Sequence, residues 1–375
     1  MLSIQPRCAE GTRHPNRQTA MNDPHVQQIL HRSYELDHGH YAVGVEVLPY
    51  KLMGAIVRTD GRVTARASTH LPVMEPHDVV EHIAELAARL VADALGSGFP
   101  RHRICLGVQL GGPVETTTGL VRHYANGPDD HGKDKPPPYL WVDFPLGAAL
   151  RAATGCITAV ENDAHAFAAY EQRFGAGADT DTFGVILIRD GVGAGIVVHD
   201  ERLPVLMEFG HLRVSRRGRL CDCGMRGCIE SQAGNRALTA VVTERTGRRL
   251  DGLEAAIDLA EGGGAQARLA LTAFRGAGAA VAFGIGQLLS LLSPGQVVVY
   301  AARDLITGGP GRLAANAFLH ELHRFHTRAF HVSRHCRLTT KPLNLVRGAH
   351  GAALIALQSC FGVRLHPRSA NHLPR

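Results

Sequence analysis

The chain is poor in aromatic side chains and lacks a long apolar run. Aromatic residues make up 5% of its 375 residues, and there is a single tryptophan. No uninterrupted apolar run approaches the ~18 residues that a membrane-spanning helix needs. The N-terminal segment, MLSIQPRCAEGTRHPNRQTA, has no apolar core of the kind found in secretory signal peptides. We therefore expect a cytoplasmic protein that does not enter a membrane.

An excess of one charge is also missing. The chain has 40 Lys plus Arg against 34 Asp plus Glu, a formal net charge of +6. Nucleic-acid binding usually shows a concentrated basic face, which so small an excess does not indicate. The 8 cysteines of a cytoplasmic chain are expected to be thiols or metal ligands rather than disulfides. Length and an ordinary hydrophobic content favour two folded domains over a disordered or disulfide-held chain.

The order of strand-like and helix-like segments predicts an α/β fold with a cleft. Residues 1–40 are polar and without periodicity, so we expect a poorly ordered tail. A strand, a turn and a second strand occur once in each half, near 44–57 and 184–198. We expect an N-terminal α/β domain over 41–160 and a C-terminal one over 161–345. A closing helix at 346–364 is expected to pack on the first domain.

A histidine and three cysteines form the strongest local pattern. His211, Cys221, Cys223 and Cys228 follow the spacing H-x9-C-x-C-x4-C. One imidazole and three thiolates are the donors of a closed tetrahedral zinc site. Gly224 and Gly227 allow the tight backbone wrap that such a site needs. The alternative is a set of ordinary cysteines. Because four protein ligands leave no open position, we expect a structural Zn²⁺ that holds the loop 208–230.

A second pattern is Glu161-Asn162-Asp163, which follows the predicted strand Ile157–Val160. Polar groups at the carboxyl end of a strand, where a helix begins, lie at the cleft of α/β folds. Asp163 is suited to accept a proton from a substrate hydroxyl, and Asn162 to hold a second hydroxyl. Taken alone, the pattern is explained as well by a plain helix N-cap.

A third pattern is the alternation of glycines in Asp190-Gly191-Val192-Gly193-Ala194-Gly195. Backbone N–H groups near Gly191 and Gly193 are candidates for contact with a phosphate. A tight turn between two strands explains the same glycines without a ligand.

These blocks, in this order, resemble the ROK family, named for repressors, open reading frames and kinases. The segment 208–230 is similar to the family's E-x-G-H element followed by C-x-C-G-x-x-G-C-x-E. The segment ENDAHAFAAYE (161–171) is similar to its E-N-D-A-N helix. The resemblance runs from about Tyr41 to Leu365. It implies two actin-like (ribonuclease H-like) α/β domains around a central cleft, with a zinc-binding loop.

The resemblance also implies roles for individual residues. In kinase members, the Asp that matches Asp163 is the base that deprotonates a sugar hydroxyl, so Asp163 is catalytic here if the chain is a kinase. Contacts with a sugar or sugar-like ligand are implied for Asn126, Asn162, Asp163, Glu208 and His211, and His211 also matches a zinc ligand. Family members are commonly dimers or tetramers, so a homodimer or homotetramer is expected.

The kinase pattern breaks where kinase members hold ATP. Their D-x-G-G-T-K turn is replaced by EVLPYK (46–51), and Pro49 has no N–H to donate to a phosphate. Glu46 is left as a candidate Mg²⁺ carboxylate. Their G-T-G turn is replaced by RDG (189–191), which brings the carboxylate of Asp190 toward phosphate oxygens. Their Gly-Gly after a later strand is replaced by YAA (300–302).

We therefore expect a non-kinase ROK protein closer to the repressor branch. It would be a sugar-binding sensor or transcriptional-regulator-like module with a structural zinc and a degenerate ATP site. The alternative is an ATP-dependent, glucokinase-like sugar kinase with Asp163 as general base. A scaffold without ligand is a third interpretation, because the segment between Leu203 and Glu208 is short. Repressor members carry a winged helix-turn-helix, for which the 40 residues before Tyr41 are too few. No direct DNA binding is thus expected from this chain.

Overall fold

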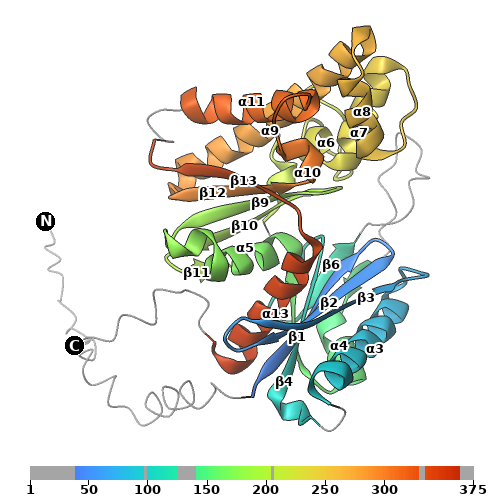
Figure 1. Ribbon diagram of the computed structural model, residues 1–375, viewed down its shortest axis with the longest axis vertical. Helices are drawn as coiled ribbons and strands as arrows, with labels where there is room; N and C mark the ends of the chain where they lie inside the picture. Colours follow the sequence, from blue (N-terminus) through green and yellow to red (C-terminus); the bar gives the residue numbers. More distant parts are fainter. Residues whose placement is uncertain (1–38, 97–98, 125–140, 204–206, 329–333, 364–375) are drawn as a thin grey trace, which may run out of the picture.

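The computed structural model describes residues 39–96, 99–124, 141–203, 207–328 and 334–363. Within them, two five-stranded sheets lie one above the other, each with its own helices (Figure 1). The strand orders are β3-β2-β1-β4-β8 and β11-β10-β9-β12-β13. In both sheets the first three strands are antiparallel neighbours and the last two run parallel to the central strand. The predicted α/β fold with two actin-like units is confirmed.

The first sheet is built from the N-terminal part of the chain. Its strands are β1 (Tyr41–Leu48), β2 (Lys51–Arg58), β3 (Val63–His70), β4 (Ile104–Leu110) and β8 (Ile157–Asn162). Helices α3 (Pro76–Leu95) and α4 (Leu146–Thr154) cover one face. A short 3-10 turn, η1 (Arg101–Arg103), leads into β4. A small separate sheet, β5-β6-β7, is formed by Val114–Glu115, Leu120–Tyr124 and Trp141–Phe144.

The second sheet has helices on both faces. Its strands are β9 (Phe183–Ile188), β10 (Val192–Val198), β11 (Glu201–Arg202), β12 (Gln296–Ala301) and β13 (Arg337–Pro342). Helix α5 (Asp163–Phe174) covers the face toward the first sheet. The other side carries α6 (Glu230–Ala233), α7 (Asn235–Thr246), α8 (Gly252–Glu261), α9 (Gly264–Leu292), α10 (Arg303–Ile306) and α11 (Leu313–Arg328). Two 3-10 turns are η2 (Ala176–Ala178) and η3 (Phe209–His211).

Helix α9 is the one helix in the described part of the chain that is long and apolar enough to cross a bilayer, by length and composition alone. Polar residues interrupt its apolar sequence, so the sequence did not indicate a spanning helix. Its apolar face is, however, buried in the core of the second sheet, where Phe274, Val281 and Ile285 pack. It also lies against α11, α7 and α8. The packing of a core helix thus accounts for the apolar character of α9.

The last helix, α13 (Leu345–Phe361), lies between the first sheet and α5 (Figure 1). Close approach requires glycine on the strands beneath it. A Cβ at Gly44 would lie 1.9 Å from the carbonyl oxygen of Ala349, and one at Gly107 would lie 2.0 Å from that of Ala352. Because α13 follows β13 directly, the chain crosses from the second sheet back to the first at this helix. The domain limits of 41–160 and 161–345 stay a prediction.

Some elements follow from the sequence and others do not. Helix α3 has local causes: Pro76 is its first residue, and Gly96, at φ 86°, follows its end. The small sheet and β13 were missed, because β5 has only two residues and β13 has the polar sequence RLTTKP. The predicted N-terminal tail lies almost entirely outside the described residues.

Candidate functional site

A cavity of about 390 Å³ lies between the two sheets. Its walls come from the β1–β2 turn, the start of α5, the β9–β10 turn and the segment around η3. The sequence-predicted residues that line it are Asn162, Asp163, Glu208, His211, Cys223, Gly191 and Gly193. They come from distant parts of the chain, so the fold brings the predicted sugar-side residues to one place. The remaining predicted contact, Asn126, lies outside the described residues.

The side chain of Asp163 stands at the first position of α5 and faces the cavity. Its Oδ1 accepts a hydrogen bond from the backbone N–H of Ala164 at 2.9 Å. Its Oδ2 lies 4.0 Å from the guanidinium of Arg189. Burial raises the pKa of Asp163, and the positive charge of Arg189 opposes this shift without cancelling it. A carboxylate in this state is a better proton acceptor than an exposed one.

Asn162 is both the N-cap of α5 and a wall of the cavity. Its Oδ1 accepts from the N–H of Ala164 at 2.9 Å, which is the plain cap that the sequence left open. Its amide nitrogen donates to the carbonyl of Gly112 at 2.9 Å. The side chain therefore fixes the turn from β8 into α5, on which Asp163 depends for its direction.

Behind this turn lies a buried pair, Glu161 and His165. The Nδ1 of His165 is 3.2 Å from Oε1 of Glu161, which also accepts from the N–H of Asn162 at 2.8 Å. Burial raises the pKa of Glu161, but the hydrogen bond and charge of His165 outweigh it and leave the pKa below its ordinary value. The sequence named Glu161 only as part of a motif. Through these contacts, the pair stabilises the first turn of α5.

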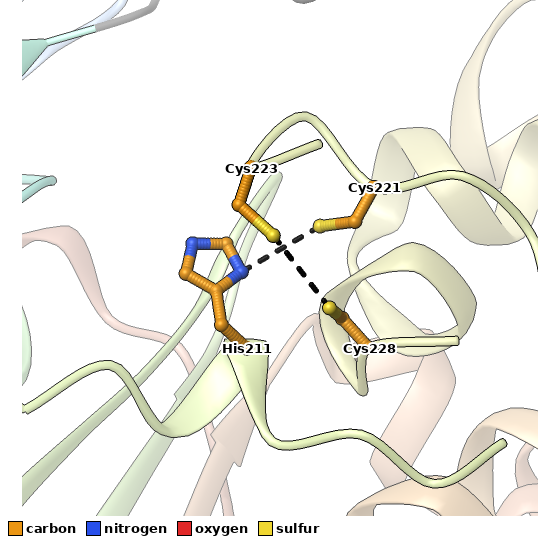
Figure 2. A group of neighbouring side chains, drawn as sticks. All are labelled: His211, Cys221, Cys223 and Cys228. Atoms are coloured by element: carbon orange, nitrogen blue, oxygen red, sulfur yellow. Dashed lines mark hydrogen bonds between the residues drawn. The ribbon is translucent and has the colours of Figure 1, made fainter. Parts of the chain in front are cut away.

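The four predicted metal ligands form one cluster (Figure 2). The donor atoms of His211, Cys221, Cys223 and Cys228 all lie within 4.8 Å of one another. The Sγ of Cys221 is 3.5 Å from Nδ1 of His211, and the Sγ atoms of Cys223 and Cys228 are 3.7 Å apart. One imidazole and three thiols at these separations fit a tetrahedral zinc ion. Such an ion would cross-link the loop and supply no open coordination position.

Two thiols of the cluster, Cys221 and Cys228, are held in their protonated form by burial. In the absence of a metal, burial raises the pKa of Cys228 to about 11 and that of Cys221 further still. Metal binding must therefore release protons, because thiolates are the ligands.

The cluster is joined to the cavity through His211 and Cys223, which both line it. The Nε2 of His211 lies 3.6 Å from Oε2 of Glu208, while its Nδ1 faces Cys221. Glu230, just after the cluster, accepts the N–H of Val192 at 2.9 Å. Zinc bound at the cluster would thus hold Glu208 and the β9–β10 turn in place.

An ion pair between Arg189 and Glu46 lies beside Asp163. Arg189 donates to Oε1 of Glu46, whose side chain is 0% exposed. Burial raises the pKa of Glu46, and Arg189 opposes this. In the sequence, Arg189 stands out only as a departure from G-T-G, and its pairing with Glu46, 143 residues away, was not predicted. The available signal was a lone arginine at the end of the apolar strand β9.

The glycines of the β9–β10 turn serve packing as well. A Cβ at Gly195 would lie 2.4 Å from the carbonyl oxygen of Ala164, and one at Gly193 would lie 3.2 Å from its Cβ. Strand β10 can therefore lie close against the start of α5, which brings the turn to Asp163. Contact of Gly191 or Gly193 with a phosphate stays a prediction.

Comparison with known proteins finds both kinases and regulators. The chain is 29% identical over 207 residues to a glucokinase of Thermotoga maritima, which covers 54% of this chain and 60% of that protein. It is 26% identical over 271 residues to a putative xylose repressor of Caldicellulosiruptor, which covers 68% and 63%. It thus spans less than two thirds of the length of these relatives. A ROK hexokinase structure from Thermus thermophilus superposes with a TM-score of 0.68 at 26% identity, over 85% of this chain and 98% of that one.

These matches do not confirm the repressor branch. The kinases among them support the kinase alternative better than our first expectation of a non-kinase regulator. The family itself is clear, because the ROK family model matches residues 42–359, nearly the whole described chain. The chain therefore belongs to the ROK family, and its two sheets of matching strand order and its His-Cys₃ cluster agree with this.

Proposed function

We propose that this chain binds a sugar in the cavity between its two sheets, with a sugar hydroxyl donating to Asp163. The observation that carries the proposal is the convergence of Asp163, Asn162, Glu208 and His211 on one cavity of about 390 Å³. That volume lies in the range of small-molecule sites, and several polar groups from two of its walls suit a ligand rich in hydroxyls.

We further propose that binding is not followed by phosphoryl transfer, so that the chain acts as a sugar-responsive module. Transfer from ATP depends on positioning and on neutralising phosphate charge. Here Glu46, the candidate metal carboxylate, is already paired with Arg189. In the turn between β9 and β10, the backbone N–H of Val192 already donates to Glu230 and so is not free for a phosphate.

Calorimetry of the zinc-loaded protein against hexoses, pentoses and N-acetylated sugars tests the binding. Removal of a charge-assisted hydrogen bond costs about 1.5–3 kcal/mol, so Asp163→Ala should weaken binding about 10- to 150-fold. The matched control is Asp143→Ala, since Asp143 is an exposed carboxylate paired with Arg122. Absence of binding across the panel, or equal affinity in Asp163→Ala and wild type, would contradict the proposal.

The second candidate is an ATP-dependent sugar kinase, which the named glucokinase and hexokinase relatives favour. Asp163, whose pKa is raised, would take the proton of the attacking hydroxyl. In that case Asp163→Asn should abolish formation of sugar phosphate and leave sugar binding largely intact. Equal turnover in Asp163→Asn and wild type would exclude Asp163 as the base.

A further inference from the structure

One arginine joins the two sheets at the wall of the cavity. Arg189 follows β9 in the second sheet and donates to Glu46, which lies near the end of β1 in the first. Its other terminal nitrogen lies 4.0 Å from Oδ2 of Asp163. The three side chains are 19%, 0% and 14% exposed, respectively. A single guanidinium is therefore shared between two largely buried carboxylates.

The surroundings hold this arrangement in place. A Cβ at Gly348 of α13 would lie 2.4 Å from Cδ of Glu46, so the helix backbone closes over that carboxylate. The guanidinium of Arg189 lies over the ring of Phe167, with its Cζ 5.4 Å from the centroid. Stacking on an aromatic face orients a planar guanidinium and limits its rotamers.

The carboxylates of Glu46 and Asp163 need a positively charged partner between them. Two buried carboxylates repel each other and are costly to keep ionised without a positive partner. Burial lowers the pKa of Arg189, but the charges of Glu46 and Asp163 outweigh it and raise the pKa above its ordinary value. Arg189 is thus positively charged at any pH at which the protein is folded.

We infer that Arg189 is a built-in counter-ion that takes the place of a divalent cation at Glu46. It is a positioning residue: it ties the two sheets together and assembles the Asp163 wall of the cavity with neither a metal ion nor a nucleotide. Glu46 therefore does not fit a Mg²⁺ ligand in this chain, because its partner is already the arginine. This inference concerns Arg189 and its two carboxylate partners and holds whether or not the cavity takes a sugar.

Removal of the arginine should convert the pair of carboxylates into a cation site. Oxygen ligands are what Mg²⁺ and Mn²⁺ prefer, and Arg189→Ala leaves two of them beside a space that water can fill. Mn²⁺ is the probe, measured by electron paramagnetic resonance on zinc-loaded protein without sugar. We expect Arg189→Ala to gain one Mn²⁺ site that wild type lacks. That site should be lost in Arg189→Ala/Glu46→Gln, and guanidinium ion at non-denaturing concentration should compete for it.

The matched control is Arg173→Ala. Arg173 also joins the two halves, by donating to the carbonyl of Asp60 at 3.3 Å, but it has no carboxylate partner among the described residues. It should gain no Mn²⁺ site. Glu46-dependent Mn²⁺ binding in wild type, or equal binding in Arg189→Ala and Arg173→Ala, would overturn the inference. If Arg189→Ala folds only with a counter-ion present, Mn²⁺ during refolding must recover it, and failure to recover it counts against the inference.

Discussion

Lys341→Met tests how helix α5 is held on the second sheet. Glu171 on α5 is completely buried, and Lys341 on β13 donates to its two oxygens at 2.7 and 2.8 Å. The hydroxyl of Tyr300 and the N–H of Ala176 also donate to Glu171, the latter at 2.9 Å. The carboxylate thus links the helix that begins at Asp163 to two strands of the second sheet.

The cost of this substitution follows from burial. Removing one partner of a buried ion pair typically costs about 3–5 kcal/mol, because the remaining charge is left uncompensated. The side chain of Lys341 is 29% exposed, so water reaches the site, and two neutral donors to Glu171 remain. We therefore expect a loss of about 3 kcal/mol in the free energy of unfolding, the lower end of the range. Lys341→Met/Glu171→Gln removes both charges and should recover more than half of that loss.

Urea unfolding followed by circular dichroism measures the effect. Lys51→Met is the matched control, because no ion pair of Lys51 is found in the described part of the chain. It should change the free energy of unfolding by no more than about 0.5 kcal/mol. A Lys341→Met loss as small as that of Lys51→Met would refute the reasoning, and so would a double variant that is no more stable than the single one.

Three further predictions concern the metal cluster, the stability of the protein at low pH, and glycines of strand β1 and helix α9. Chelation of zinc should lower the melting temperature of the protein. Zinc affinity should rise with pH, because the thiols must ionise to bind the metal. A metal-free protein with an unchanged melting temperature would contradict the first expectation. The folded-state pKa of Glu161 is lowered, so its contribution to stability is present above the unfolded pKa of about 4.3 and is lost as the pH falls through the folded value. Glu161→Gln should therefore flatten the loss of stability in acid, and an unchanged acid titration of stability would speak against it. Gly44→Ala should cost at least about 3 kcal/mol in the free energy of unfolding, because its Cβ would collide with the backbone of α13. Gly276→Ala, whose Cβ would meet nothing within 4 Å, should gain about 0.5–1 kcal/mol. Similar effects of the two substitutions in unfolding titrations would contradict the close packing of α13 on β1.

Local signals predicted the elements whose causes are local. Helix α5 begins at Asp163 because Asn162 caps it, and it ends at Phe174, where Gly175 follows. The zinc ligands were found for the same reason, since Cys221, Cys223 and Cys228 lie within one short loop. By contrast, β13 is a strand because it pairs in parallel with β12, and its own residues are mostly polar.

The electrostatics of the cavity could not be read from the sequence. Arg189 and Glu46 are 143 residues apart, and only the stacking of the two sheets brings them together. In the sequence, RDG (189–191) and EVLPYK (46–51) are two separate departures from a phosphate cradle. In the structure they are one feature, since the arginine of the first segment neutralises the glutamate of the second.

Sugar binding without phosphoryl transfer is tested most directly by one mass-spectrometric measurement. Zinc-loaded protein is incubated with Mg-ATP and a pool of sugars, and both the sugar retained by the protein and any sugar phosphate are quantified. We predict a retained sugar that is lost in Asp163→Ala, and no phosphorylated product at high protein concentration. A sugar phosphate that forms with wild type and disappears with Asp163→Asn would contradict this account and identify the chain as a kinase.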